Sequence, residues 1–476
     1  MDTYLQVALL ILHINVALLA IGHALLHKRT SQSALGWVAT CILFPLVGPI
    51  LYFFFGINRV FSRAKKLWEE SLPLQQLPEQ RKSLYVMQND LDLPREFSEL
   101  AAFFNAVTDN ALLPGNRVEA LHNGEQAYPA MLEAIGAAQQ CVYLSTYIFR
   151  ADKTGNAFID ALAAAQARGV EVRVLIDGYG DLYYFPRGSI NLKKRGLKIR
   201  RFLPFMLIPP SAYLNLRTHR KILTVDGQTA FVGGMNIGDH HLAANAANSR
   251  RVVDLHFRLS GPIVAQLEGV FLRDWAFTAR ERLAPTAAAH SETGNAICRA
   301  VTDGPNEDVD KITLSLVSAV SAARRAVSII TPYFLPPREL IGALQGAALR
   351  GIDVSVILPA RNNLPFVHRA TRNMLWELLQ HGVKVYYQPP PFVHSKLFLI
   401  DERYAQIGSA NLDPRSLRLN FEIMVEIYDE EFARQMAAHV AAVKQHSMQI
   451  TLADVENRPL HTRLLDAAFW LFSPYM

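Results

Sequence analysis

One polar pattern occurs twice in this chain of 476 residues, with identical spacing in both copies. The first copy lies in RTHRKILTVDGQTAFVGGMNIGD and the second in FVHSKLFLIDERYAQIGSANLD. Both read H-x-K-x4-D-x6-G-[GS]-x-N, and the matched pairs are His219 with His394, Lys221 with Lys396, Asp226 with Asp401, Gly233 with Gly408, and Asn236 with Asn411. One H-x-K alone is weak evidence, whereas five matched positions rarely recur by chance. The pattern therefore predicts a duplicated unit built around a polar site.

The sequence around the two motifs is duplicated as well. GAAQQCVYLSTYIF at 136–149 is echoed by SAARRAVSIITPYFL at 321–335, and GVEVRVLIDG at 169–178 by GIDVSVILPA at 351–360. Apolar residues between these stretches recur at helical spacing, as in Phe158, Leu162 and Ala165. Strands that alternate with such helices predict an α/β fold. We expect two similar lobes of mixed sheet flanked by helices, at 113–287 and 288–450, related by a pseudo-twofold axis that gives one shared active site.

The residue types of the motif suit attack on a phosphodiester without a metal. One neutral imidazole can attack phosphorus while a protonated imidazole gives a proton to the leaving oxygen, so the pKa values of His219 and His394 must differ. Lys221 and Lys396 supply positive charge at the non-bridging oxygens, with Asn236 and Asn411 as neutral donors. We therefore predict no metal ion and no cofactor. The other thirteen of the fifteen histidines, including His240 and His241, have no partner at catalytic spacing.

A nucleophilic imidazole also needs a carboxylate to hold its second nitrogen. Asp254 in RRVVDLHF and Glu422 in RLNFEIMV each follow a motif in a strand-like stretch, and each could reach the histidine of the opposite lobe. Asp226 and Asp401 belong to the motifs and count among the catalytic candidates. Because each lies seven residues beyond its histidine, we favour a role as an anchor at the far end of the strand, by about two to one, since buried carboxylates are usually paired.

Two apolar runs precede the repeats. YLQVALLILHINVALLAIGHALL and ALGWVATCILFPLVGPILYFFFG contain no Asp, Glu, Lys or Arg, and each has the roughly 20 residues that cross a bilayer. They predict a transmembrane hairpin at 1–58, with helices at about 4–26 and 34–56, and Pro45 and Pro49 mark a kink or a broken helix in the second. A buried helix pair of a soluble domain is the alternative. More basic residues follow the second run than lie in the turn, which favours catalytic lobes on the cytoplasmic side.

The net charge limits the classes of binding partner, and the cysteine positions bear on disulfides and metal sites. The formal net charge of +6 favours anionic partners, either nucleic acid or acidic lipid, and the apolar hairpin favours lipid. Three distant cysteines, Cys41, Cys141 and Cys298, indicate neither a disulfide framework nor a zinc site.

Three further segments complete the predicted organisation. Residues 59–112 are expected to form a linker or cap, and residues 451–476 an amphipathic tail at the membrane interface. In this tail Phe469, Trp470, Leu471 and Phe472 are expected either to form an aromatic anchor at the interface or to pack on the hairpin. The stretch NLKKRGLKIRRFLPFMLIPPSAYL at 191–214 combines six basic residues with an apolar run that includes Phe202 and Leu203. It predicts either a membrane-docking segment or an ordinary basic surface followed by a packed loop.

The two motifs resemble those of the phospholipase D superfamily over about residues 113–445. More narrowly, the apolar N-terminal pair, the phrase NLDPRSLRLNFE at 411–422 and the C-terminal FWLFSPYM are similar to bacterial cardiolipin synthases. That resemblance implies a multi-pass protein of the bacterial inner membrane that binds phosphatidylglycerol and cardiolipin. The implied reaction joins two phosphatidylglycerol molecules into cardiolipin and glycerol through a phosphohistidine. By analogy His219 is the nucleophile and His394 the acid and base, and the two roles could be exchanged.

One position departs from the family pattern, because Gly234 occupies the place that Ser409 has in the second motif. A hydroxyl donor is then missing on one side, and we expect a modest effect because a backbone N–H group can substitute.

Other functions fit parts of the same pattern. A membrane-bound phospholipase D that uses water or another alcohol needs the same histidines and differs only in its acceptor. A nucleic-acid phosphodiesterase fits the basic charge but leaves the apolar hairpin unexplained, so we expect no nucleic-acid partner. A non-enzymatic scaffold would predict decay of one motif, and both motifs are intact. The acceptor, the acyl-chain preference and the oligomeric state are left open by the sequence.

Overall fold

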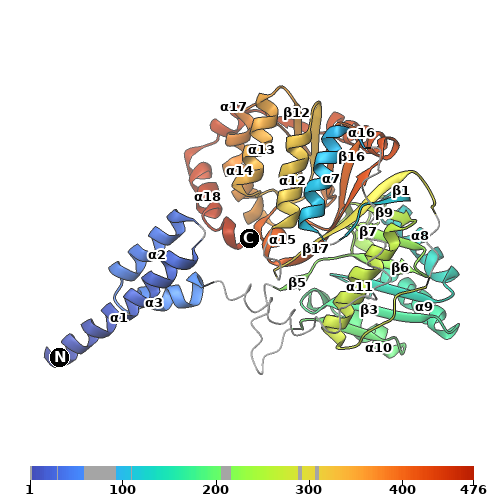
Figure 1. The fold of residues 1–476 in the computed structure, drawn as a ribbon, viewed down its shortest axis with the longest axis horizontal. Coiled ribbons are helices and arrows are strands. Elements are labelled where there is room, and N and C mark those ends of the chain that lie inside the picture. Colours follow the sequence, from blue (N-terminus) through green and yellow to red (C-terminus); the bar gives the residue numbers. More distant parts are fainter. Residues whose placement is uncertain are drawn as a thin grey trace. The chain divides into compact units, whose positions relative to one another are not determined.

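The structure is a computed structural model that describes residues 3–28, 30–57, 93–108, 110–204, 216–287, 292–305 and 310–476 (Figure 1). The chain divides into two compact units, Met1–Ala64 and Lys65–Met476. Most of the predicted linker, residues 58–92, lies outside the described residues.

The N-terminal unit contains one long apolar helix, α1 (Thr3–His27). Among the described residues, α1 is the one helix long and apolar enough to cross a membrane. The second apolar run, expected as a kinked or broken helix at about 34–56, is broken. It is divided into α2 (Ser31–Leu43), α3 (Val47–Leu51) and a π-helical turn, η1 (Tyr52–Gly56). The break falls at Pro45, where the proline ring excludes a continuous helix, and Leu46 takes a positive φ of 62°.

Polar groups within this unit form hydrogen bonds with one another. The His23 Nδ1 atom lies 2.7 Å from the Tyr52 hydroxyl, and the Leu46 N–H donates to His13 Nδ1 at 3.1 Å. Ala24, Cys41 and Tyr52 form a small buried cluster between the helices. Most other large apolar side chains of α1 are exposed.

The first described element of the larger unit is α7 (Arg95–Val107). After α7, the same order of strands and helices occurs twice. The first half comprises β1 (Leu113–His122), α8 (Asn123–Ala137), β2 (Cys141–Thr146), α9 (Lys153–Ala167), β3 (Glu171–Asp177), η3 (Gly180–Leu182), α10 (Gly188–Lys194), β4 (Ile199–Phe202), β5 (Arg217–Thr218), β6 (Ile222–Val225), β7 (Thr229–Gly233), η5 (Asp239–His241), β8 (Val252–Val253), β9 (Leu255–Ser260) and α11 (Ile263–Ala279).

The second half follows the same plan and adds a C-terminal extension. It comprises β10 (Ala296–Asp303), α12 (Lys311–Ala322), β11 (Ala326–Ile330), α13 (Arg338–Leu349), β12 (Asp353–Pro359), α14 (Pro365–Leu379), β13 (Lys384–Gln388), β14 (Phe392–Val393), β15 (Leu397–Ile400), β16 (Tyr404–Gly408), α15 (Pro414–Arg418), β17 (Asn420–Tyr428) and α16 (Glu430–Gln445). The extension comprises β18 (Met448–Ile450), α17 (Leu452–Glu456), α18 (Leu460–Trp470) and η6 (Ser473–Tyr475).

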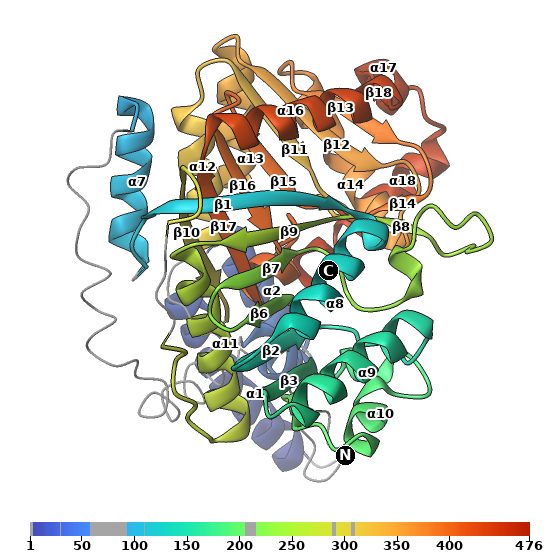
Figure 2. The same ribbon diagram turned by 90° about the vertical axis from the view of Figure 1, so that its right-hand side faces the viewer.

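The strands of both halves join into one mixed sheet. Its order is β18-β13-β12-β11-β15-β16-β17-β10-β1-β9-β7-β6-β2-β3-β4, with β1 and β10 paired antiparallel at the junction. Figure 2 shows β1 crossing the middle of the sheet, with β11, β12, β13, β15 and β16 of the second half above it and β9, β7, β6, β2 and β3 of the first half below. The predicted α/β fold of two similar lobes is thus present, and one continuous sheet connects the lobes.

Burial explains why these stretches form central strands. All six residues of β2 are buried, and β2 pairs in parallel with β3, as β11 does with β12. Parallel strands covered by helices on both faces need such continuous apolar sequences. A core of residues from both lobes, including Leu259 of β9 and Val425 of β17, packs beneath α11 and α16. This shared core holds the lobes together.

Two very short strands cross between the lobes. The strand β5 pairs in parallel with the start of β17, through Arg217 with Asn420 and Thr218 with Phe421. In the same way β14 pairs with β8, through Phe392 with Val252. Each short strand therefore places the residue that follows it beside the residue that follows its partner in the other lobe.

The C-terminal extension packs on the second lobe. Asp466 of α18 is buried and forms ion pairs with Arg369 and Arg372 of α14 and with Arg458. Phe469 and Trp470 pack against the core of the lobe, so they do not supply the exposed aromatic anchor that the sequence predicts.

Candidate active site

The short crossing strands place both histidines between the lobes. His219 follows β5 and its N–H donates to the Phe421 carbonyl at 2.9 Å. His394 follows β14 and its N–H donates to the Val253 carbonyl at 2.8 Å. Each histidine is thereby held by the main chain of the opposite lobe. The motif lysines follow two residues later, at the entrances to β6 and β15.

Each imidazole contacts a buried carboxylate of the other lobe. His219 Nδ1 lies 2.9 Å from Glu422 Oε1, and His394 Nδ1 lies 2.9 Å from Asp254 Oδ2. Both carboxylate side chains are fully buried. An Nδ1 that is engaged with a carboxylate leaves the Nε2 of the same ring for chemistry. The geometry therefore provides two oriented imidazoles in one site.

The two lysines are buried beside the histidines. Lys221 Nζ donates to the His219 carbonyl at 2.6 Å, whereas Lys396 Nζ lies 2.8 Å from His394 Nδ1 and 3.0 Å from Nε2. Burial lowers the pKa of Lys221 to about 7 and that of Lys396 to about 8, because the charged form loses hydration. A negatively charged ligand between them would favour the charged form of both.

Burial and neighbouring charges separate the pKa values of the two imidazole–carboxylate pairs. Burial lowers the pKa of His219 to about 4, and burial together with Lys396 and Lys221 lowers that of His394 well below its usual value. Burial raises the pKa of Asp254 to about 7. Burial alone would raise the pKa of Glu422, but its contact with His219, the Lys221 ammonium and the hydrogen bond from Ser409 hold it below its ordinary value. The first pair therefore has the more acidic carboxylate.

The motif asparagines are fixed in different ways. Asn236 accepts the Ile148 N–H through Oδ1 at 3.1 Å, so its amide nitrogen is available as a donor. The Asn236 main chain receives the Tyr128 hydroxyl at 2.8 Å and donates to His241 Nε2 at 3.1 Å. Asn411 instead donates to the Ser416 hydroxyl at 3.1 Å. His241 thus supports the site, although its spacing in the sequence did not indicate this.

Ser409 and Gly234 occupy equivalent positions with different neighbours. The Ser409 hydroxyl donates to Glu422 Oε2 at 2.5 Å. At Gly234 an added Cβ would lie only 2.4 Å from Asp254 Oδ1, so a side chain there would displace this carboxylate. The Leu255 N–H donates to Asp254 Oδ1 at 2.8 Å instead.

Asp226 and Asp401 lie at the far ends of β6 and β15, away from the histidines. Asp226 accepts the backbone N–H groups of residues 139, 140 and 141, each at 2.8 Å. Asp401 accepts those of residues 324, 325 and 326 at 2.7–2.8 Å. Each carboxylate therefore ties the hairpin after the motif to the start of a central strand, which is the anchoring arrangement.

Two tyrosines that the motif spacing did not indicate also line the site. The Tyr147 ring lies 5.3 Å from the His219 ring, and the Tyr333 ring lies 6.4 Å from the His394 ring, measured between centroids. Both follow the first strands of the repeated β-α-β stretches, β2 and β11. The repeat could have indicated this location, because loops after parallel strands gather at one edge of the sheet.

The stretch 191–214 is divided in the structure. Phe202 is buried in a cluster with Trp275 and Phe421, and Leu203 packs against that cluster. Of the two alternatives for this stretch, these two residues therefore follow the packed one and not membrane docking, because the end of β4 contributes to the core. Residues 205–214 of this segment lie outside the described residues.

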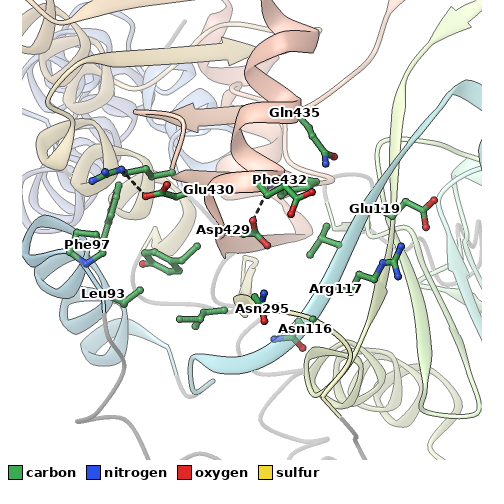
Figure 3. A pocket seen from close by; sticks show the side chains of 17 residues that line it. Leu93, Phe97, Asn116, Arg117, Glu119, Asn295, Asp429, Glu430, Phe432 and Gln435 are labelled. Carbon is green, nitrogen blue, oxygen red and sulfur yellow. Dashed lines mark hydrogen bonds and ion pairs between the residues drawn. The ribbon is translucent and has the colours of Figure 1, made fainter.

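A pocket of about 750 Å³ lies elsewhere in the larger unit (Figure 3). It is lined by residues that include Asn116 of β1, Tyr428 of β17, and Asp429 and Glu430 at the start of α16. Tyr428 lies six residues along β17 from Glu422, a distance of about 20 Å at about 3.4 Å per residue. This pocket is therefore not the histidine site. Within the described ranges, no three His, Cys, Asp or Glu residues are grouped as metal ligands.

Comparisons with known proteins agree with this architecture. Residues 131–275 and 316–444 match the family described as cardiolipin synthase, PLD-like domain, and residues 16–56 match the phospholipase D-nuclease N-terminal family. The chain is 31% identical to the major cardiolipin synthase of Bacillus subtilis, over 96% of this chain and 97% of that protein. It is 33% identical to cardiolipin synthase A of Pseudomonas aeruginosa, over 95% of this chain and 92% of that protein.

A solved structure has a similar fold. The phosphatidylserine synthase of Haemophilus influenzae superimposes with a TM-score of 0.61, covering 80% of this chain and all of that chain, at 14% identity. At that identity the likeness concerns the fold of the two lobes.

Proposed function

This chain belongs to the cardiolipin synthase family of the phospholipase D superfamily, and from that premise we propose that it joins two phosphatidylglycerol molecules into cardiolipin and glycerol. The observation that carries the proposal is the pairing of His219 with Glu422 and of His394 with Asp254 across the lobes, at 2.9 Å each. Two oriented imidazoles between two buried lysines suit transfer of a phosphatidyl group.

His219 acts as the nucleophile in this proposal. Its partner Glu422 has the lowered pKa and is ionised at neutral pH, so it holds the proton of neutral His219 on Nδ1. The Nε2 lone pair of His219 then faces the phosphorus atom. Ser409 donates to the same carboxylate and keeps it in place.

His394 acts as the general acid and base. Its partner Asp254 has a pKa near 7, so the pair retains a proton at neutral pH. That proton lies between Asp254 and Nδ1. The neutral imidazole then carries its own proton on Nε2, from which it can pass to a leaving oxygen. The unequal carboxylates thus support the assignment of the two roles.

The reaction has two balanced halves. In the first, His219 Nε2 bonds to the phosphorus of one phosphatidylglycerol, the bond from phosphorus to the glycerol oxygen breaks, and His394 gives that oxygen a proton. In the second, a hydroxyl of another phosphatidylglycerol gives its proton to His394 and bonds to phosphorus while the bond to His219 breaks. Lys221, Lys396 and the Asn236 amide stabilise charge on the non-bridging oxygens, so the proposal needs no metal ion or cofactor.

The apolar N-terminal unit supports transfer to a lipid. The helix α1 is long enough to anchor the chain in a membrane, and we propose that the broken second run completes a multi-pass anchor in the bacterial inner membrane, with the catalytic lobes on the cytoplasmic side. An acceptor held in the bilayer has a high effective concentration beside the phosphohistidine and competes with water. The tail is proposed to meet the interface through exposed Leu460, Leu464 and Leu471 of one α18 face.

Product analysis tests the proposal directly. Full-length protein in vesicles of phosphatidylglycerol, without added metal, is expected to yield cardiolipin and glycerol in equal amounts by mass spectrometry. The variants His219→Ala and His394→Ala are expected to yield neither product, while His446→Ala, which changes an exposed histidine at the end of α16, matches the unaltered chain. Phosphatidic acid as the main product would contradict the proposal and identify a phospholipase D that uses water.

A further inference from the structure

Exposed apolar side chains of the larger unit gather in few places. Among its described residues, the large hydrophobic side chains that are exposed lie mainly on α14 and α18 or in the loop between β3 and α10. In that loop and the first turn of α10 they are Tyr179, Leu182, Tyr183, Phe185 and Ile190, and the Phe185 side chain is 91% exposed. We name residues 179–190 the aromatic loop.

The aromatic loop is held firmly at its base. The buried Asp181 accepts the N–H of Ser189 at 3.1 Å and its hydroxyl at 2.6 Å, which ties the two ends of the loop together. The Arg150 guanidinium lies 3.7 Å from the centre of the Tyr184 ring. The exposed positions therefore belong to a braced loop that presents apolar side chains outward.

Two successive contacts between aromatic rings connect the aromatic loop to the catalytic histidine. The Tyr183 ring lies 6.0 Å from the Tyr147 ring, and the Tyr147 ring lies 5.3 Å from the His219 ring. Aromatic rings therefore lead from the exposed surface to the imidazole that we assign as the nucleophile.

Basic residues follow the loop, and the other lobe lacks an equivalent. Arg187 lies in the loop itself, and Lys193 and Lys194 are exposed at the end of α10, whereas Arg195 pairs with Asp160 at 2.7 Å. Aromatic residues with basic ones in the same segment suit an anionic lipid surface. In the second lobe, the connection between β12 and α14 is only residues 360–364, with the polar sequence Ala-Arg-Asn-Asn-Leu. Its Asn363 accepts the Tyr333 hydroxyl at 2.8 Å.

We propose that the aromatic loop docks the first lobe on an anionic phospholipid bilayer, so that a lipid enters past Tyr183 and Tyr147 to His219. The acyl chains of such a lipid would stay beside Phe185, and its phosphate would reach the buried Lys221 and Lys396 at the histidine site. This inference rests on the proposed function for the identity of the lipid. The docking itself can be measured without catalysis.

Site-specific labelling tests the docking. The three native cysteines are all buried, so a cysteine introduced by Phe185→Cys can be labelled selectively with an environment-sensitive fluorophore on the full-length chain. In nanodiscs containing phosphatidylglycerol, the emission is expected to shift to the blue and to be mostly lost when spin-labelled lipids are included. The control is Leu349→Cys, an equally apolar and 70% exposed position at the end of α13.

The control position should stay in water. Because α13 runs back from the active-site edge to the start of β12, Leu349 lies at the opposite edge of the lobe. A label at Phe185→Cys that is no more quenched than the Leu349→Cys label would overturn the proposal. A shift that depends on protein concentration and not on lipid would also overturn it, because it would indicate contact with a second copy.

Kinetics separate docking from chemistry. Phe185→Ser is expected to raise the KM for bilayer phosphatidylglycerol several-fold and to leave kcat unchanged, while Leu349→Ser changes neither. With a short-chain phosphatidylglycerol dissolved as monomers, Phe185→Ser should equal the unaltered chain. If Phe185→Ser lost the same activity on monomers, the loop would act on the reaction and docking would be refuted. If the unaltered chain made no cardiolipin at all, the proposed function would fail while the quenching result still decided the docking.

Discussion

The two lobes carry the same motif on equivalent strands, but they support the histidines with different carboxylates. Glu422 receives the Ser409 hydroxyl at 2.5 Å, a short bond to a charged acceptor. Asp254 receives the backbone N–H of Leu255 at 2.8 Å, and Gly234 leaves no room for a side chain. The lobe with Ser409 therefore stabilises an ionised carboxylate more strongly than the lobe with Gly234.

This difference shows how a duplicated site can divide two tasks. Both histidines are buried and both lose hydration, so identical partners would give them similar proton affinities. The structure instead combines a carboxylate of lowered pKa at His219 with one of raised pKa, about 7, at His394. One imidazole is then prepared to attack and the other to exchange a proton.

The largest effects are expected at the histidines themselves. His219→Ala removes the atom that bonds to phosphorus, so turnover should fall to background. His394→Ala removes proton transfer, which contributes about 10²–10⁴-fold, and should leave slow formation of the phosphoenzyme with a substrate whose leaving group needs no proton. Mass spectrometry of the denatured protein should then find the phosphatidyl group on His219.

The same experiment can also contradict the roles assigned to the two histidines. A phosphatidyl group on His394 in the His219→Ala variant, with none on His219 in the His394→Ala variant, would exchange the two roles. Equal labelling of both residues would show that the unequal carboxylates do not divide the tasks.

The carboxylates should give the next largest effects. Glu422→Gln keeps the size of the side chain but favours the wrong tautomer of His219, and the equivalent change in serine proteases lowers kcat about 10⁴-fold. Asp254→Asn should cost less, about 10²-fold to 10³-fold, because Asp254 already holds a proton part of the time at neutral pH. Steady-state rates on phosphatidylglycerol vesicles measure both, and a greater loss in Asp254→Asn would contradict the proposed division.

Much of the fold and of the site could be predicted from the sequence, because hydrophobic periodicity and motif spacing are local properties of the chain. The repeated strands, the helices between them and the two motifs each leave such a local pattern. Asp254 and Glu422 could be selected because each is the first carboxylate in the strand-like stretch that follows a motif. The anchoring role of Asp226 and Asp401 follows from the distance along one strand.

The remaining features depend on contacts that no local pattern records. The strands β5, β8 and β14 have two residues each, too few for any periodicity, yet they decide which carboxylate meets which histidine. For Phe202 the sequence allows both a docking surface and a packed segment, because an apolar residue after basic ones fits an interface as well as a core strand. The aromatic loop went unrecognised because an irregular loop has no repeating pattern to detect.

The pH dependence should distinguish the lysines from the Asp254 pair. Burial lowers the pKa of Lys221 to about 7 and of Lys396 to about 8, so each loses its charge as the pH rises through these values. Since the charged form stabilises the phosphoryl oxygens, kcat/KM should fall above about pH 7. On the acid side, His219 stays neutral until the pH falls to about 4.

Lys221→Arg keeps the charge at every pH, because a guanidinium is not deprotonated in this range. The variant should have a lower maximal rate, since the larger head group fits the buried site poorly, but its alkaline decline should be less steep, because only the Asp254 pair near pH 7 and Lys396 near pH 8 still titrate. A profile of kcat/KM against pH measures this change in steepness. A decline as steep as that of the unaltered chain would remove the argument for Lys221.

Ser409→Ala should give the smallest effect and the most specific one. The change removes one hydrogen bond to a charged carboxylate, worth about 1.5–3 kcal/mol, so it should slow turnover by roughly ten-fold to a hundred-fold. Because the hydroxyl lowers the pKa of Glu422, its loss should raise that pKa and move the acid limb of the pH profile upward. Ser416→Ala is the matched control, since the Ser416 hydroxyl binds Asn411 and does not touch Glu422. If Ser409→Ala and Ser416→Ala shifted the acid limb equally, Ser409 would act by general packing, and the two lobes would differ less than their hydrogen bonds suggest.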